Sequence, residues 1–208
     1  PNRGAFVAVQ ALRGTYSLVR RLALLDLTHD AEELAQKVLT TFPGLCGLLP
    51  PAAVCTDFDP FNAAHWPEGP RPAADLLAAA SAGIAKLPAP DERFALIAGY
   101  GQDTVVDLRR RRGRLEFGRG SAGDGTVPLA LAHWPGLPAW YAEESHGSLP
   151  GHAGVGRAVI DLARGETTNA LPHVLPKRRS IPTLWQEDTR APPAAKVDWN
   201  DLSEREQR

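Results

Sequence analysis

The segment that most constrains the fold is RFALIAGY, residues 93–100. It is a short, continuous apolar run that leads into glycine, as expected for a strand covered on both faces. Such strands occur mainly in parallel sheets, and they need neighbours along their edges. A second strand, PAWYAEE, is predicted at residues 138–144. Together the two segments predict an α/β fold with a mostly parallel sheet.

Helices are predicted in the first half of the chain. Residues 28–42 have a helical apolar face and can be capped by Thr28 or Asp30. Residues 72–87 are rich in alanine and have a proline near the expected first turn. The aromatic, proline-rich segment between these helices, residues 57–72, is predicted to be a loop.

The second half predicts a different order of elements. Residues 104–120 are expected to form a β-hairpin with its arginine run, 109–112, at the tip near Gly113. Residues 154–165 predict an amphipathic helix that ends at glycine. Beyond Thr168 the chain is rich in proline and charge, which predicts an extension that wraps the surface or links to another module.

Composition excludes several broad classes. Charged residues make up 23% of the chain and the formal net charge is −1, so no overall field favours nucleic acid or an anionic membrane. No apolar run approaches the roughly 18 residues of a membrane span, and no signal-peptide pattern is present. Cys46 and Cys55 are too few for a disulfide framework and are expected to be reduced. The compartment stays open, with the cytoplasm as the default.

Two residues with catalytic potential follow predicted strands. Asp124 lies in AGDGTVPLALA, residues 122–132, and His146 lies in the loop after the second strand. Loops at the carboxyl ends of parallel strands meet at one edge of a sheet, where ligands bind in open α/β folds. A carboxylate that accepts the imidazole Nδ1–H leaves Nε2 free to take a proton from a hydroxyl. Asp before His is also the order in which these two members of an α/β-hydrolase triad occur.

These segments carry a resemblance to a known family. GDGTVPLALA (123–132) and WYAEESHGSLPGHAGVGRAVIDL (140–162) resemble the carboxyl-terminal half of α/β-hydrolases related to lecithin:cholesterol acyltransferase, including bacterial lipase-like members. The opening PNRGAFVAVQALRG is similar to the segment that follows a Gly-Thr-Pro motif in that family. By this resemblance Asp124 is the triad acid and His146 the triad base.

The resemblance also implies a domain organisation. It covers about residues 1–168, which would be the carboxyl-terminal part of an α/β-hydrolase with an inserted β-hairpin. Residues 15–90 match the position of a helical cap insertion. Residues 169–208 are expected to be an extension or linker.

The sequence departs from the family at the nucleophile. A G-x-S-x-G elbow is absent from the 208 residues, and the glycine frame is missing around every serine. The serines without this frame are Ser17, Ser81, Ser121, Ser145, Ser148, Ser180 and Ser203. The chain also begins with Pro1 and contains no methionine. We therefore expect the nucleophilic serine, and the oxyanion-hole donors, to lie in a segment outside this sequence.

The predicted activity is that of a serine esterase, lipase or acyltransferase. Its substrate would be an ester or lipid, its partner a preceding hydrolase segment or other modules of the same protein, and it would need no metal or organic cofactor. Neither nucleic acid nor an integral membrane span is expected. The alternative is a catalytically inactive hydrolase-like module with an interaction or regulatory role in a larger protein.

Structural explanations compete with each catalytic role. Asp124 can form an Asx or hairpin turn, and His146 can be a loop histidine that caps the following helix. His152 is a rival base. A zinc site at the two histidines is disfavoured because their spacing matches no helical H-E-x-x-H motif.

Other features remain open at this stage. The arginine run can contact phosphate or be the solvated tip of the hairpin. The aromatic loop with Phe58, Phe61 and Trp66 can be an acyl-binding lid or a loop pinned by its own rings. Asn2 and Arg3 would lie near the active-site rim by the resemblance, although a solvated loop explains them equally well. Trp134 and Trp140 are expected to pack beside the second strand.

Overall fold

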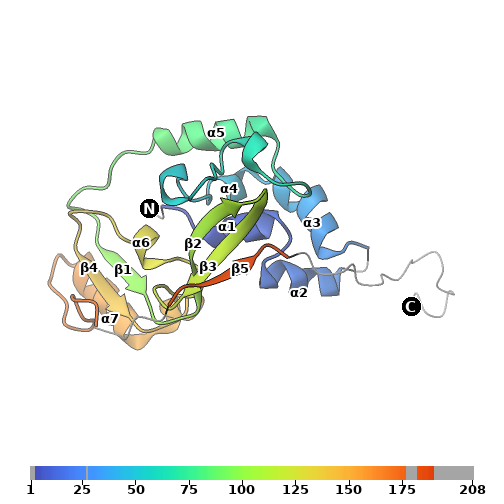
Figure 1. The fold of residues 1–208 in the computed structure, drawn as a ribbon. Coiled ribbons are helices and arrows are strands. Elements are labelled where there is room, and N and C mark those ends of the chain that lie inside the picture. Colours follow the sequence, from blue (N-terminus) through green and yellow to red (C-terminus); the bar gives the residue numbers. More distant parts are fainter. Residues whose placement is uncertain (1–2, 27, 177–181, 190–208) are drawn as a thin grey trace, which may run out of the picture.

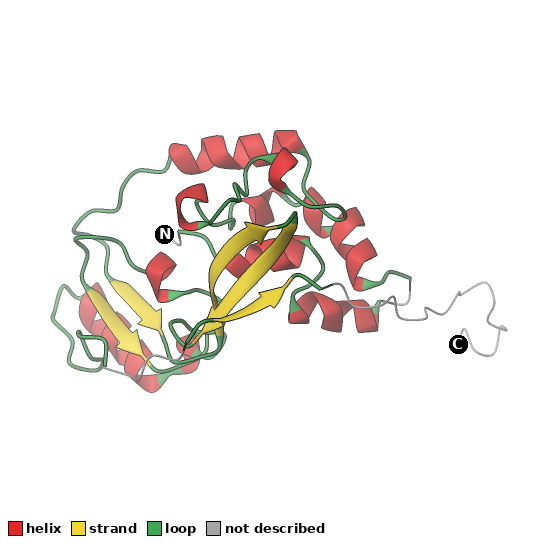
Figure 2. Ribbon diagram, in the orientation of Figure 1, coloured by secondary structure: helices red, strands yellow, loops and turns green. Residues whose placement is uncertain are grey.

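The computed structural model describes residues 3–26, 28–176 and 182–189 (Figure 1). The strands form two sheets, a parallel pair and a three-stranded antiparallel sheet in the order β2-β3-β5. Figure 2 shows most of the helices gathered around the antiparallel sheet, with the parallel pair to one side. The predicted α/β class is confirmed at this level. In chain order the elements are α1 (Phe6–Leu12), α2 (Ser17–Leu25), α3 (Ala31–Lys37), η1 (Leu39–Thr41), α4 (Pro43–Cys46), η2 (Ala52–Val54), η3 (Ala63–His65), α5 (Ala74–Ala85), β1 (Leu96–Gly99), β2 (Thr104–Arg111), β3 (Arg114–Gly120), α6 (Leu129–Ala132), β4 (Ala139–Ala142), η4 (Leu149–Gly151), α7 (Ala153–Ala163) and β5 (Leu184–Glu187).

The parallel pair consists of the two strands predicted from the apolar runs. β1 and β4 lie side by side with Leu96 opposite Ala139 and Gly99 opposite Ala142. Helix α7 packs on one face of the pair through Val155, and the short helix α6 covers the other face. The carboxyl ends of both strands therefore meet at one edge, as the sequence predicts.

The antiparallel sheet is built on the predicted hairpin. Arg112 and Gly113 both have positive φ, which is the backbone of a type I′ turn between β2 and β3. Strand β5 pairs with the other edge of β3 and was not predicted. Its four residues are exposed and have no alternating pattern, so the edge of β3 defines this strand more than its own sequence does.

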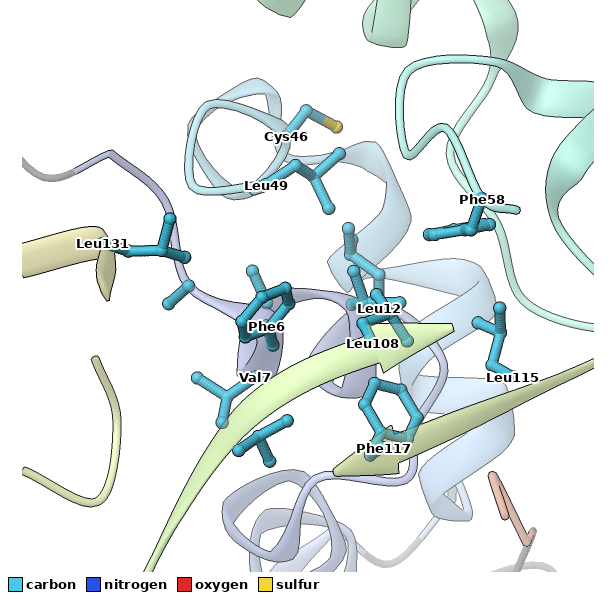
Figure 3. Packing of buried hydrophobic residues seen from close by; sticks show 14 of the residues in the cluster. Phe6, Val7, Leu12, Cys46, Leu49, Phe58, Leu108, Leu115, Phe117 and Leu131 are labelled. Atoms are coloured by element: carbon cyan, nitrogen blue, oxygen red, sulfur yellow. The ribbon is translucent and has the colours of Figure 1, made fainter. Parts of the chain in front are cut away.

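The main core lies between the hairpin and the first helices. Figure 3 shows Phe6 and Leu12 of α1 packed against Leu108 and Phe117 of the hairpin. Leu12 and Leu108 are fully buried. Helix α1 is therefore held by tertiary packing, which compensates for its length of only seven residues.

One predicted helix, over residues 28–42, has different limits in the structure. Asp30, and not Thr28, caps α3, and its Oδ1 accepts a hydrogen bond from the Glu33 N–H at 2.8 Å. The helix predicted over 28–42 ends at Lys37 and continues as the 3₁₀ turn η1. The Thr40 hydroxyl donates to the Gln36 carbonyl at 2.8 Å, a bond that competes with regular helix geometry. Within the described ranges, every helix is too short or too polar to cross a bilayer.

Candidate active site

The loop that carries Asp124 is tied to the start of β2. Gly125 N donates to the Thr104 hydroxyl at 2.8 Å, and that hydroxyl donates to the Gln102 carbonyl at 2.8 Å. Gln102 N in turn donates to the Gly123 carbonyl at 3.0 Å. Thr104 itself is fully buried, so its hydroxyl is fixed inside the protein. The loop around Asp124 is therefore anchored on both sides of the aspartate.

Two glycines allow the loop to approach its neighbours. A Cβ on Gly99, at the end of β1, would lie 2.6 Å from the Asp124 Cβ and 2.8 Å from the Glu144 carbonyl oxygen. A Cβ on Gly123 would lie 2.6 Å from the Val127 carbonyl oxygen. All three distances are far below ordinary carbon contacts of about 3.5–4.0 Å. The end of β1, the Asp124 loop and the His146 loop can therefore approach one another only because Gly99 and Gly123 have no side chain.

The two oxygens of the Asp124 carboxylate have different partners. Oδ1 accepts hydrogen bonds from the backbone N–H groups of Thr126 at 2.9 Å and Val127 at 2.7 Å. These bonds form the Asx turn that a structural explanation predicts. Oδ2 lies 2.8 Å from Nδ1 of His146. The turn thus accounts for only one oxygen, and the imidazole uses the other.

His146 is fixed by its backbone as well as by its ring. Its N–H donates to the Asp124 carbonyl at 2.8 Å, beside the side-chain contact. The Asp124 side chain is 6% exposed, whereas the His146 side chain is 53% exposed. Because the carboxylate accepts at Nδ1, the neutral ring carries its proton there, and Nε2 has no hydrogen-bond partner among the described residues. A buried acid therefore orients a half-exposed base.

The rival base, His152, has another task. It is the N-cap of α7, and its Nδ1 accepts a hydrogen bond from Val155 N at 3.3 Å. The helix-capping role considered for His146 therefore belongs to His152. The structure brings Asp124 together with His146 and not with His152.

The serines of the described ranges are not bonded to this base. Ser145 Oγ and Ser148 Oγ lie in the same loop, but they bond each other at 3.0 Å. Ser17, Ser81 and Ser121 have no hydrogen bond to His146 among the described residues. Ser180 and Ser203 lie outside the described residues. Within the part of the chain that the structure covers, the His146 ring therefore has no hydrogen bond from a serine hydroxyl.

A second histidine contact lies nearby on the α6 side of β4. His133 hydrogen-bonds the Tyr141 hydroxyl, and the two rings stack with centroids 5.6 Å apart. Burial raises the pKa of Tyr141 above its usual value. The phenol therefore stays protonated at neutral pH. We interpret the stacked pair as part of the packing around β4.

The arginine run is partly built into the sheet. Arg109 Nε donates to Glu116 at 2.6 Å, and its guanidinium lies 3.7 Å from the Trp185 ring centroid. Arg111 and Arg112 are exposed at the hairpin tip. The tip prediction holds for these two, whereas Arg109 contributes to the packing of β5.

The aromatic loop is held by its own side chains. Phe58 and Trp66 make an edge-to-face contact at 5.6 Å, and both are buried. Trp66 Nε1 donates to the Pro60 carbonyl at 2.9 Å. Trp140 is buried against α7, as expected. Asn2, predicted at the rim, lies outside the described residues, and Arg3 lies near Trp134.

Thr104 and Gly99 were missed by the sequence analysis. Thr104 looks like an ordinary strand residue, and Gly99 like a strand end. The Gly-Tyr-Gly that follows an apolar run was the available signal for Gly99, because glycine in a strand often marks close backbone approach.

Comparisons add no relatives to this picture. Searches against protein-family models, curated proteins and solved structures found no match in any of the three. Among the described residues, no group of three His, Cys, Asp or Glu side chains is arranged to hold a metal ion.

Proposed function

We propose that Asp124 and His146 are the acid and base of a serine hydrolase that cleaves an ester or lipid substrate or transfers its acyl group. The observation that carries the proposal is the 2.8 Å contact between Asp124 Oδ2 and His146 Nδ1. The buried carboxylate holds the imidazole in the tautomer whose Nε2 accepts a proton. The half-exposed ring is open to a substrate and to a hydroxyl group.

The proposed chemistry follows from this tautomer. Nε2 of His146 takes the proton of a serine hydroxyl as its oxygen attacks the ester carbonyl, and the carboxylate of Asp124 stabilises the imidazolium. The imidazolium then gives that proton to the departing alkoxide, which leaves an acyl-enzyme. Water or an acceptor alcohol, deprotonated by the same nitrogen, then attacks the acyl carbonyl. The bond to the serine oxygen breaks, that oxygen takes the proton back from the imidazolium, and the acid or the new ester is released. The serine is proposed to come from a segment outside residues 1–208.

The arrangement of strands is compatible with part of a larger hydrolase sheet. β1 has β4 on one side and no strand partner on the other among the described residues. We infer that β1 and β4 are the last two parallel strands of an α/β-hydrolase sheet, with α7 packed behind them and residues 15–90 as the cap. Residues 1–168 would then be the hydrolase portion and residues 169–208 an extension.

An activity-based probe tests the proposal on the intact natural polypeptide. A fluorophosphonate is expected to label the protein, and His146→Ala is expected to abolish the labelling. His29→Ala is the matched control, because His29 Nδ1 also contacts an aspartate, Asp26, at 3.0 Å. The control variant should label like the wild type.

Asp124→Asn tests the acid separately. In a serine protease with this relay the same change lowers kcat about 10⁴-fold by favouring the wrong tautomer, and we expect a comparable loss of ester hydrolysis here. A folded protein that does not label would favour the non-catalytic module, whereas labelling that is unchanged in His146→Ala would exclude His146 as the base. Activity of Asp124→Asn within a few-fold of wild type would also contradict the proposal.

A further inference from the structure

A largely apolar cavity of about 460 Å³ lies between the cap helices and the segment after α6. This volume is within the range of about 300–1,000 Å³ that is typical of small-molecule sites. The end of α5 and the residues after it form one wall, and the α4–η2 connection and the aromatic loop form another. Its main apolar lining residues are Leu49, Phe61, Ile84, Leu87, Pro88 and Trp134.

The cavity is separate from the candidate active site. None of its lining residues belongs to the loop around Asp124 or to the loop around His146. A ligand bound here would therefore not contact the proposed acid and base. Ligand binding in this cavity is therefore independent of the proposed hydrolase activity.

Arg3 is the cation of this cavity, and its backbone is firmly placed. Ala5 N donates to the Leu48 carbonyl at 2.9 Å. Gly4 has a φ of +93°, and a Cβ there would lie 2.4 Å from the Leu49 carbonyl oxygen. The chain therefore runs tightly along the cavity wall at the residue after Arg3.

The guanidinium of Arg3 is poorly neutralised. Its Nη1 donates to the His133 carbonyl at a long 3.5 Å, and its Cζ lies 5.5 Å from the Trp134 ring centroid. Within the described ranges it forms no ion pair. A guanidinium presents five N–H donors, so most of them are available to a ligand. An anion that reaches this group can make charge-assisted hydrogen bonds, in a bidentate arrangement if it is a carboxylate.

Asp59 supplies the opposite charge elsewhere on the cavity wall. Its Oδ1 accepts a hydrogen bond from Phe61 N at 2.9 Å, within its own loop. It makes no ion pair with Arg3, since the two are not within ion-pair distance. The carboxylate of Asp59 is thus partly satisfied locally, whereas the charge of Arg3 has only weak partners. This difference favours an anionic over a cationic ligand.

We propose that this cavity binds a single-chain aliphatic carboxylate, with its carboxylate on Arg3 and its chain among the apolar walls. Each methylene of the ligand that moves from water into the cavity raises the affinity about fourfold. The bonds between the ligand's carboxylate and the Arg3 guanidinium raise the affinity about tenfold or more. Trp134, whose ring lies beside the Arg3 guanidinium, lines the site.

Titration calorimetry with decanoate, kept below its micelle concentration, tests the proposal. Decanoate should bind, and Arg3→Gln should weaken binding at least about tenfold. Arg21→Gln, at an exposed arginine of α2, is the charge-matched control and should bind like wild type. Asp59→Asn should bind decanoate somewhat more tightly, because it removes a like charge.

Two further ligands and one variant separate the contributions of head and chain. Decanol should bind at least about tenfold more weakly than decanoate, and butyrate should show no measurable binding. Ile84→Trp should abolish decanoate binding by filling the cavity, while its circular dichroism and melting temperature show that it folds. Equal binding of decanol and decanoate, equal binding by wild type and Arg3→Gln, or no binding of decanoate to wild type would each overturn the proposal.

Discussion

Replacing Gly99 with alanine probes the junction on which the candidate site depends. The added Cβ would lie 2.6 Å from the Asp124 Cβ, 2.8 Å from the Glu144 carbonyl oxygen and 3.2 Å from Leu149 Cδ1. Carbon atoms pack at about 3.5–4.0 Å, so the loop around Asp124 must withdraw by roughly 1 Å. The contact between Asp124 and His146 is 2.8 Å long, and a distance near 3.6 Å is no longer a hydrogen bond. One methyl group is therefore expected to break the pair without altering either of its members.

The energetic consequence is measurable by thermal unfolding. Overpacking of this kind costs about 1–3 kcal/mol, which lowers Tm by about 2–4 °C per kcal/mol in a chain of this size. We expect Gly99→Ala to melt about 2–12 °C below wild type. Proton NMR should also show loss of the downfield resonance of the His146 Nδ1–H. The variant Asp124→Asn should lose the same resonance.

Gly156→Ala is the matched control for this experiment. It adds the same methyl group on α7, where no atom lies within 4 Å of the new Cβ. Alanine is favoured over glycine in a helix by about 0.5–1 kcal/mol, so this variant should melt at or above the wild-type temperature. A Gly99→Ala variant that keeps both the wild-type Tm and the downfield resonance would contradict this prediction.

Two further predictions concern the stability of the fold. Arg13 and Asp188 form an ion pair at 2.9 Å with both side chains 3% exposed, so Asp188→Asn should lower the free energy of unfolding in urea and speed amide exchange at Trp185. The loss should reach at most about 3–5 kcal/mol, the cost of leaving a buried charge without its charged partner, and unchanged exchange would contradict this prediction. Burial raises the pKa of Cys55 from 9.0 to about 12, so the thiol loses its proton in the unfolded chain before it does so in the folded one. Stability should therefore fall as the pH rises above 9, less steeply in Cys55→Ala, and an identical pH dependence of urea unfolding in both proteins would exclude this cause.

Local patterns predicted most of the elements around the site. The apolar runs at 93–100 and 138–144 contain β1 and β4, and the turn at Gly113 joins the predicted hairpin. The contact between Asp124 and His146 could also be predicted, because it follows from two parallel strands ending at one edge. Its catalytic role stays a prediction.

Features that depend on distant partners could not be predicted. β5 is a strand because the edge of β3 is open to it, and LWQE alone carries no such signal. The Thr104 hydroxyl holds the Asp124 loop. In the sequence, Thr104 is indistinguishable from an ordinary strand residue. Arg3 and Trp134 are far apart in the sequence but lie side by side in the fold, where both line the cavity. Pairings of this kind have no local periodicity, so they appear only when the fold is known.

The late position of β5 in the chain has a consequence for synthesis on the ribosome. Its partner residues, Glu116–Arg119 on β3, are made about seventy residues before Leu184–Glu187. At about 5–20 residues per second, β5 is synthesised several seconds after the hairpin. During that interval its outer edge could recruit another nascent chain, and the charged side chains of Arg114, Glu116 and Arg119 protect the edge until the correct strand emerges.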